Sequence, residues 1–221
     1  MKEKGKFIVF EGIDGSGKTK QFQLLYKRLK KTHKKVILAD FPRYHETTWG
    51  KLLRDFLDGK FGKLNEIDPH LALLPYMIDE YTWSRDVGLP WLKNGGIVLS
   101  NRYFTSNVHQ IAKLKTIARN KFRAWLWRAG YEELGIVRPD LVIFLDVPPA
   151  FSSVLNKMKP SRDIAEKDWN HQAAAYREYL RTIKDQNYWI RVRCLTSKTI
   201  DAPKIIHERV WSVVSRKLGS R

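Results

Sequence analysis

The chain has 221 residues, of which 43% are hydrophobic. This length suits one sizeable core and is short for two, so residues 1–221 are predicted to form a single domain. The 41 basic and 23 acidic side chains leave a net charge of +18, which requires an anionic partner or a tolerant surface. The lone cysteine, Cys194, excludes an internal disulfide and any cysteine-based zinc cluster.

The charge alone does not name the partner, because polyphosphate nucleotides, nucleic acid and an acidic membrane face would each suit it. The N-terminal apolar run, residues 7–10, is far shorter than a signal-peptide core or a membrane span. A cytoplasmic protein without a membrane contact is therefore predicted.

Apolar runs separated by helical patterns predict an α/β fold. The predicted strands are 7–11, 36–41, 96–100, 141–147 and 188–194. The first four are continuous apolar runs, as expected for strands covered on both faces, while the fifth alternates like an edge strand. Strands that alternate with helices predict a five-stranded, mostly parallel sheet between two helical layers. Ligands of such sheets bind beyond the carboxyl ends of the strands.

The segment 113–128 carries six basic and no acidic residues. Its apolar residues recur at helical spacing, which predicts a helix with a buried stripe and a basic face. The stripe comprises Leu114, Ile117, Ala118, Phe122, Trp125 and Leu126. The basic face is expected to be solvated or packed on a subunit, with a nucleic-acid surface as the alternative.

A phosphate-binding motif follows the first predicted strand. The pattern G-x-x-x-x-G-K-[ST] is matched in full by Gly12, Ile13, Asp14, Gly15, Ser16, Gly17, Lys18 and Thr19. A strand before it and an amphipathic helix after it point backbone N–H groups at a phosphate. Lys18 is expected to reach the β and γ phosphates of ATP, and the Thr19 hydroxyl to ligate Mg²⁺.

Two arginines follow the next two predicted strands. Arg43 comes after the second strand and Arg102 after the third, so both are expected to face the phosphate loop. Two arginines and a lysine in one crevice suit a phosphoryl group in transfer, whose charge they offset. An arginine after a proline, as Arg43 is, is otherwise a common surface charge.

The motifs, taken in order, resemble those of thymidylate kinases, which transfer the γ-phosphoryl group of ATP to dTMP. The matching segments are "FEGIDGSGKTKQ", "FPRY", "NRYFTSN" and "RPDLVIFLDVPP", and the resemblance runs from about residue 6 to residue 215. It implies a three-layer P-loop NTPase fold, nucleotide substrates and a homodimer formed by helices on one side of the sheet. Binding of nucleic acid is not expected.

The resemblance also implies roles for single residues. Arg43 would hold the acceptor phosphate, Arg102 would bridge the donor and acceptor phosphates, and Asp14 would lie near the acceptor sugar and the metal. On the acceptor side, the resemblance implies Tyr76 stacked on the thymine, with Asn107 and Gln110 lining the base and deoxyribose.

On the donor side, the resemblance places a lid over ATP at about residues 156–169. The phosphate loop contains no arginine, so the lid residue Arg162 is expected to supply the catalytic charge. An ordinary solvated basic loop is the alternative. Asp146 would lie in the Mg²⁺ shell, and Ser197 and Lys198 fall where the family cradles adenine.

Two residues depart from the family pattern. Asn101 stands where an aspartate is usual, and Glu80 stands where many members carry an arginine that reads the thymine carbonyl. A carboxylate cannot donate a hydrogen bond unless protonated, and Arg85 is poorly spaced to replace that arginine. Two alternatives therefore stay open: a nucleotide or deoxynucleoside kinase with another acceptor, and a basic P-loop protein that binds nucleic acid. A deoxynucleoside kinase would need a carboxylate base just after the second strand, where Arg43 stands.

Overall fold

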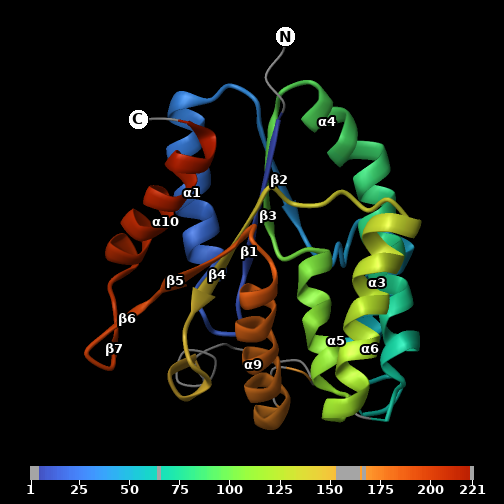
Figure 1. Ribbon diagram of the computed structural model, residues 1–221. Coiled ribbons are helices and arrows are strands. Elements are labelled where there is room, and N and C mark those ends of the chain that lie inside the picture. The colour runs from blue at the N-terminus through green and yellow to red at the C-terminus, as the bar shows by residue number, and fades with distance from the viewer. Residues whose placement is uncertain (1–4, 64–65, 153–164, 166–167, 220–221) are drawn as a thin grey trace.

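A computed structural model gives the architecture of the protein (Figure 1). The structure describes residues 5–63, 66–152, 165 and 168–219. Five parallel strands form one sheet in the order β2-β3-β1-β4-β5. The strands are β1 (Lys6–Glu11), β2 (Val36–Asp40), β3 (Ile97–Asn101), β4 (Leu141–Asp146) and β5 (Trp189–Arg193). The predicted α/β fold is confirmed, with β5 at one edge of the sheet.

Helices cover both faces of this sheet and make the structure three-layered (Figure 1). On one face lie α1 (Lys18–Thr32) and α10 (Pro203–Leu218). The other side carries α3 (Pro69–Trp83), α5 (Val108–Ala112), α6 (Thr116–Trp127) and α9 (Trp169–Asp185). The remaining helices are α2 (Thr48–Leu57) and α4 (Leu89–Lys93), with a 3-10 turn η2 (Phe104–Asn107) and π-helical turns η1 (Ser84–Gly88) and η3 (Arg128–Glu133). In the described part of the chain, no helix is both long and apolar enough to cross a membrane.

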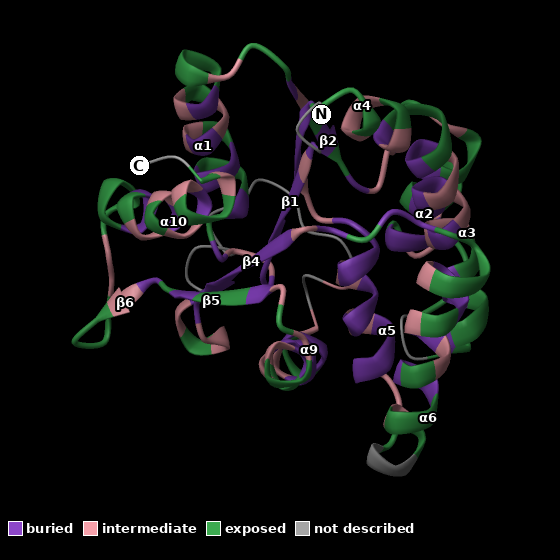
Figure 2. Ribbon diagram, turned by 45° about the horizontal axis from the view of Figure 1, so that its top comes forward, coloured by how far each residue is buried: buried purple, intermediate pink, exposed green. Residues whose placement is uncertain are grey.

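The apolar run of the central strand β1, residues 7–10, is explained by its position between the two cores. Phe7 and Val9 point into the core beneath α3 and α9, whereas Ile8 and Phe10 point into the core beneath α1 and α10. Because successive side chains of a strand face opposite sides, both cores are filled from one run of apolar residues. Figure 2 shows these strands buried between the two helical layers.

The buried stripe predicted for α6 is confirmed in part. Phe122 and Leu126 are buried in the core, and Trp125 is half-buried, but Ala118 is exposed. The basic face of α6 is partly internal, because Arg119 and Arg123 both donate to the buried carboxylate of Glu178 on α9. These two arginines stabilise the packing of α6 on α9 and are not part of an outward basic surface.

Candidate active site

A cavity of about 570 Å³ opens beyond the carboxyl ends of the strands. Its walls come from the loop after β1, the end of β2, helix α3, the segment after β3 and the start of α9. Its volume falls within the range of sites that bind a small molecule, about 300–1,000 Å³. The site therefore lies where a parallel α/β sheet is expected to bind its ligand.

The phosphate loop forms one wall and joins β1 to α1. Gly12, Gly15 and Gly17 all have positive φ angles, and a Cβ on Gly12 would lie 2.6 Å from Ser16 Oγ. Lys18 Nζ donates to the carbonyls of Gly12 and Ile13 at 2.8 and 2.9 Å. Together with the start of α1, this loop directs N–H groups and one lysine at the cavity, as phosphate binding requires.

Arg102 lies against the phosphate loop from the segment after β3. Its guanidinium donates to Asp14 Oδ1 and lies 3.8 Å from Glu11 Oε2. Burial opposes the charged form, but the charges of Asp14, Tyr179 and Glu11 raise the pKa of Arg102 above its ordinary value. Its φ of 63° is in the left-handed region, where residues other than glycine are uncommon. The protein therefore holds a permanent cation beside the loop in a constrained conformation.

Asp14 is fixed from the opposite side by Gln172 on α9. Gln172 Nε2 donates to Asp14 Oδ2 at 2.8 Å, and the Asp14 N–H donates back to Gln172 Oε1 at 3.2 Å. Gln172 also donates to the carbonyl of Ala165, which lines the cavity. No sequence motif marked Gln172, because its partner is 158 residues away.

A pair of histidines that the sequence analysis missed also lines the cavity. His109 Nδ1 lies 3.3 Å from His171 Nε2. Burial lowers the pKa of His109 well below its ordinary value and lowers the pKa of His171 to about 4. Both rings are therefore neutral at pH 7 and add no charge to this wall.

The four residues considered at the predicted acceptor site, Tyr76, Glu80, Asn107 and Gln110, all line the cavity. Glu80 is buried and accepts from Asn107 Nδ2 at 3.2 Å. Burial, followed by the charge of Asp79, raises the pKa of Glu80 well above its ordinary value. A protonated Glu80 carboxyl can donate a hydrogen bond, which a carboxylate cannot. Arg85 is exposed and pairs with Asp86, so it does not replace the missing arginine.

Comparison with known proteins identifies the family. The thymidylate kinase family model matches residues 10–202. The thymidylate kinase of Plasmodium falciparum is 30% identical over 192 residues, which cover 86% of this chain and 83% of the relative. That of Afipia carboxidovorans is 28% identical and covers 98% and 92%. The chain belongs to the thymidylate kinase family.

Two solved thymidylate kinase structures share the fold. The Candida albicans structure superposes with a TM-score of 0.75 at 21% identity, covering 96% of this chain and 92% of that one. The Ehrlichia chaffeensis structure gives 0.68 at 21% identity, covering 96% and 100%. Members of the thymidylate kinase family are ATP-dependent kinases, so this chain is an enzyme of that class.

Arg43 does not face the phosphate loop as predicted. Its guanidinium donates to the carboxylate of Asp79 at 3.0 Å, to the Asp79 carbonyl at 2.7 Å and to Thr82 Oγ1 at 2.8 Å. Asp79 and Thr82 lie on α3, and Arg43 is not among the residues that line the cavity. The prediction of its orientation was wrong because a buried carboxylate on α3 binds the guanidinium. Its role as the ligand of the acceptor phosphate stays a prediction.

Three other predicted residues lie apart from this cavity. Asp146 accepts from Tyr176 Oη at 2.7 Å and from Arg191 Nε at 2.8 Å, so both its oxygens are engaged. Ser197 and Lys198 are exposed in the turn between the short strands β6 (Leu195–Thr196) and β7 (Thr199–Ile200). None of the three lines the cavity. Their roles at the metal and the adenine stay predictions.

The predicted lid falls mostly outside the described residues. Arg162 lies outside the described residues, so its expected role stays a prediction. At the end of the lid segment, the Asp168 side chain accepts from the His171 N–H and caps α9. Ala165, which is described, lines the cavity. The segment therefore reaches the cavity at this one described point.

The residues at the sheet edge fit a magnesium ion carried by a nucleotide. Within the described ranges, no three His, Cys, Asp or Glu side chains form a metal-binding group of their own. Mg²⁺ in phosphoryl-transfer sites is held mainly by substrate phosphates, with one or two protein groups. Thr19 lines the cavity, and the buried Asn101 Oδ1 accepts no hydrogen bond from the described residues.

Proposed function

We propose that this protein transfers the γ-phosphoryl group of ATP to dTMP, giving ADP and dTDP. One observation carries the proposal: a single cavity is lined both by the phosphate loop and by Tyr76, Glu80 and Asn107. Arg102, on the segment after β3, lines the same cavity. A monophosphate acceptor and a triphosphate donor can meet only in a site that holds both at once. Membership of the thymidylate kinase family supports the choice of dTMP.

The reaction needs positioning and charge neutralisation more than acid–base chemistry. An oxygen of the dTMP phosphate forms a bond to the γ phosphorus, and the bond from that phosphorus to the bridging oxygen breaks, leaving its electron pair on ADP. The acceptor oxygen is already ionised, so no base must remove a proton. Lys18 and Arg102 offset the phosphate charges, and Asp14 orients Arg102. Mg²⁺, when bound, would neutralise charge on the ATP phosphates, with Thr19 as a ligand.

The acceptor pocket is compatible with a thymine base even though Glu80 replaces the expected arginine. A neutral carboxyl group can donate to a carbonyl and accept from a ring N–H at the same time. Thymine presents such an N–H beside a carbonyl. Asn107 donates to Glu80 Oε2 and thereby favours Oε1 as the protonated oxygen. We infer that Glu80 reads the base as an uncharged acid.

An assay with a panel of acceptors tests the proposal. Purified protein with ATP and Mg²⁺ would be offered dTMP, dUMP, dCMP, dGMP and thymidine, with ADP release coupled to NADH oxidation and the product identified by ³¹P NMR. We expect dTMP to have the highest kcat/KM and dTDP to be the product. Turnover of another monophosphate or of thymidine, without turnover of dTMP, would overturn the proposal.

We also propose a homodimer formed through α2 and α3. Four large apolar side chains of these neighbouring helices are exposed: Trp49 at 37%, Leu52 at 38%, Leu71 at 64% and Leu74 at 50%. Large exposed apolar side chains on neighbouring helices are typical of a protein interface. Light scattering after size-exclusion chromatography should give twice the chain mass, and Leu71→Glu should give the monomer. The cytoplasmic location expected from the sequence stays a prediction.

A further inference from the structure

The carboxyl ends of β2 and β3 present a carboxylate and an amide side by side. Asp40 and Asn101 are register partners on these two parallel strands. Asn101 Nδ2 donates to Asp40 Oδ1 at 2.9 Å, and both residues line the cavity together with Lys18 and Thr19. The pair therefore lies at the donor side of the proposed active site.

Each member of this pair keeps an acceptor atom without a partner in the described structure. Asn101 Oδ1 is buried and receives no hydrogen bond from the described residues. A buried acceptor that receives no hydrogen bond destabilises the protein, so a donor from a ligand or its water shell is expected there. Asp40 is exposed to the cavity, and its Oδ2 makes no hydrogen bond to the described part of the chain.

The other carboxylates at this edge of the sheet are already engaged. Glu11 accepts from Thr105, Ser106 and Tyr179, and it is buried. Asp14 binds Arg102 and Gln172, whereas Asp146 binds Tyr176 and Arg191. Among the described carboxylates at this edge, Asp40 is therefore the one that presents an unengaged oxygen to the cavity.

We propose that Asp40 supplies the carboxylate that orients the magnesium ion of bound ATP, with Asn101 as the positioning residue that holds Asp40 by its amide. Because Asp40 and Asn101 are register partners, exchanging the two residues would place the carboxylate on β3 at the same level of the sheet. The inference rests on the proposed ATP-dependent function. It assigns a role to a residue directly at the end of a strand, where ligands of parallel sheets bind.

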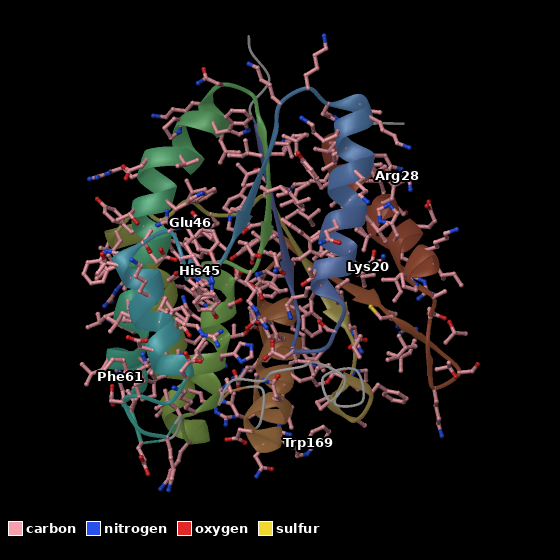
Figure 3. The ribbon with its side chains drawn as sticks, turned by 180° about the vertical axis from the view of Figure 1, so that it is seen from behind. Lys20, Arg28, His45, Glu46, Phe61 and Trp169 are labelled. Carbon is pink, nitrogen blue, oxygen red and sulfur yellow. The ribbon has the colours of Figure 1, made fainter. Side chains whose placement is uncertain are left out.

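Asp40 is surrounded by charges of both signs. Burial raises the pKa of Asp40, and the nearby charge of Glu46 acts in the same direction. The hydrogen bond from Asn101 and the charges of Arg102 and Lys18 act in the opposite direction. Figure 3 shows Glu46 on the loop after β2, and Lys20 at the start of α1 on the other side of the strand ends. A divalent cation would stabilise the Asp40 carboxylate in these surroundings.

The test measures metal binding, with Mn²⁺ as the probe and a non-hydrolysable ATP analogue bound. Mn²⁺ affinity would be followed by electron paramagnetic resonance in the wild type, Asp40→Asn, Asn101→Asp and the double exchange. Loss of a group that orients a bound metal typically weakens metal binding about 10- to 100-fold. We expect a loss of this size in Asp40→Asn and recovery in the double exchange, which places the carboxylate on β3 and keeps the amide–carboxylate pair.

A matched control separates a ligand from a general charge effect. Glu46→Gln removes a neighbouring negative charge without touching the pair, and we expect wild-type Mn²⁺ affinity in it. Wild-type affinity in Asp40→Asn, or equal losses in Asp40→Asn and Glu46→Gln, would overturn the proposal. If Asp40 instead acted as a base that removes a proton from the acceptor, Asp40→Asn would lower turnover without changing Mn²⁺ affinity. That result would also overturn the proposal. The Mn²⁺ measurement uses no acceptor. If dTMP proves not to be the acceptor, the proposed function fails, but the effect of Asp40→Asn on Mn²⁺ affinity is still a valid test of the metal site.

Discussion

Replacing Arg102 by alanine tests the arrangement at the centre of the site. The guanidinium bonds to Asp14 and lies 3.8 Å from Glu11, on the segment between the phosphate loop and the acceptor pocket. If Arg102 offsets charge on the phosphoryl group in transfer, its loss should lower kcat far more than it lowers ATP affinity. Arginines in this role contribute about 10³- to 10⁵-fold. Lys18 remains in the cavity, so we expect about 10³-fold, which corresponds to about 4 kcal/mol.

The same substitution has a cost in stability that the structure bounds. Breaking a buried ion pair costs about 3–5 kcal/mol when the partner is left uncompensated. Here Asp14 keeps its hydrogen bond from Gln172, and Glu11 keeps its hydroxyl donors Thr105, Ser106 and Tyr179. We therefore expect about 3 kcal/mol, at the low end of that range.

The assays for Arg102→Ala are steady-state kinetics with dTMP, calorimetric titration with ATP, and unfolding in urea. Arg102→Lys is the control, since it keeps the charge and loses the planar fork that can bond to two oxygens. We expect it to retain more of kcat than the alanine variant. Equal losses in kcat and in ATP affinity would refute the bridging role of Arg102.

Two further predictions concern buried carboxylates. Burial and the charge of Asp79 raise the pKa of Glu80 well above its ordinary 4.5. The unfolded chain loses this proton first as the pH rises, so wild-type stability should fall by up to about 1.4 kcal/mol per pH unit between the two pKa values. Glu80→Gln has no ionisable proton at this position. Its free energy of unfolding in urea, relative to that of the wild type, should therefore increase from pH 5 to pH 7, while turnover of dTMP persists. Glu178→Gln should destabilise the fold by about 3 kcal/mol, because it removes the charge that pairs with Arg119 and Arg123.

Controls and contrary results differ for these two variants. A stability difference between Glu80→Gln and the wild type that does not change with pH would show that Glu80 is ionised in the folded protein. For Glu178, the control is Glu133→Gln, since the Arg128–Glu133 pair is exposed and should contribute little. A loss no larger than that of the control would contradict the internal role of the basic face of α6.

The fold was predictable because its signals are local. Strands covered on both faces have mostly apolar residues, and β1, β3 and β4 each contain an apolar run with polar residues only at their ends. Their bounds therefore differ from the prediction by at most one residue. The phosphate loop was predictable for the same reason, since its glycines, lysine and threonine lie within eight consecutive residues. The hairpin of β6 and β7 was missed, because each strand has only two residues and carries no period.

The contacts of the site were less predictable because they join distant segments. The orientation of Arg43 depends on Asp79, 36 residues later, and that of Asp14 on Gln172, 158 residues later. No spacing within a motif reports such pairs. Asp40 was missed for another reason. The predicted second strand ran to residue 41, which placed Asp40 inside the strand, whereas β2 ends at Asp40 and leaves it at the edge where ligands bind.

The most direct test of the account is whether one cavity holds both nucleotides at once. A bisubstrate analogue, with adenosine and thymidine joined through five phosphates, would be titrated into the protein by calorimetry, and its cytidine counterpart would be the control. We expect one analogue to bind per chain, much more tightly than ATP or dTMP alone and more tightly than the cytidine compound. An affinity no better than that of ATP, or no preference for thymidine, would contradict this expectation.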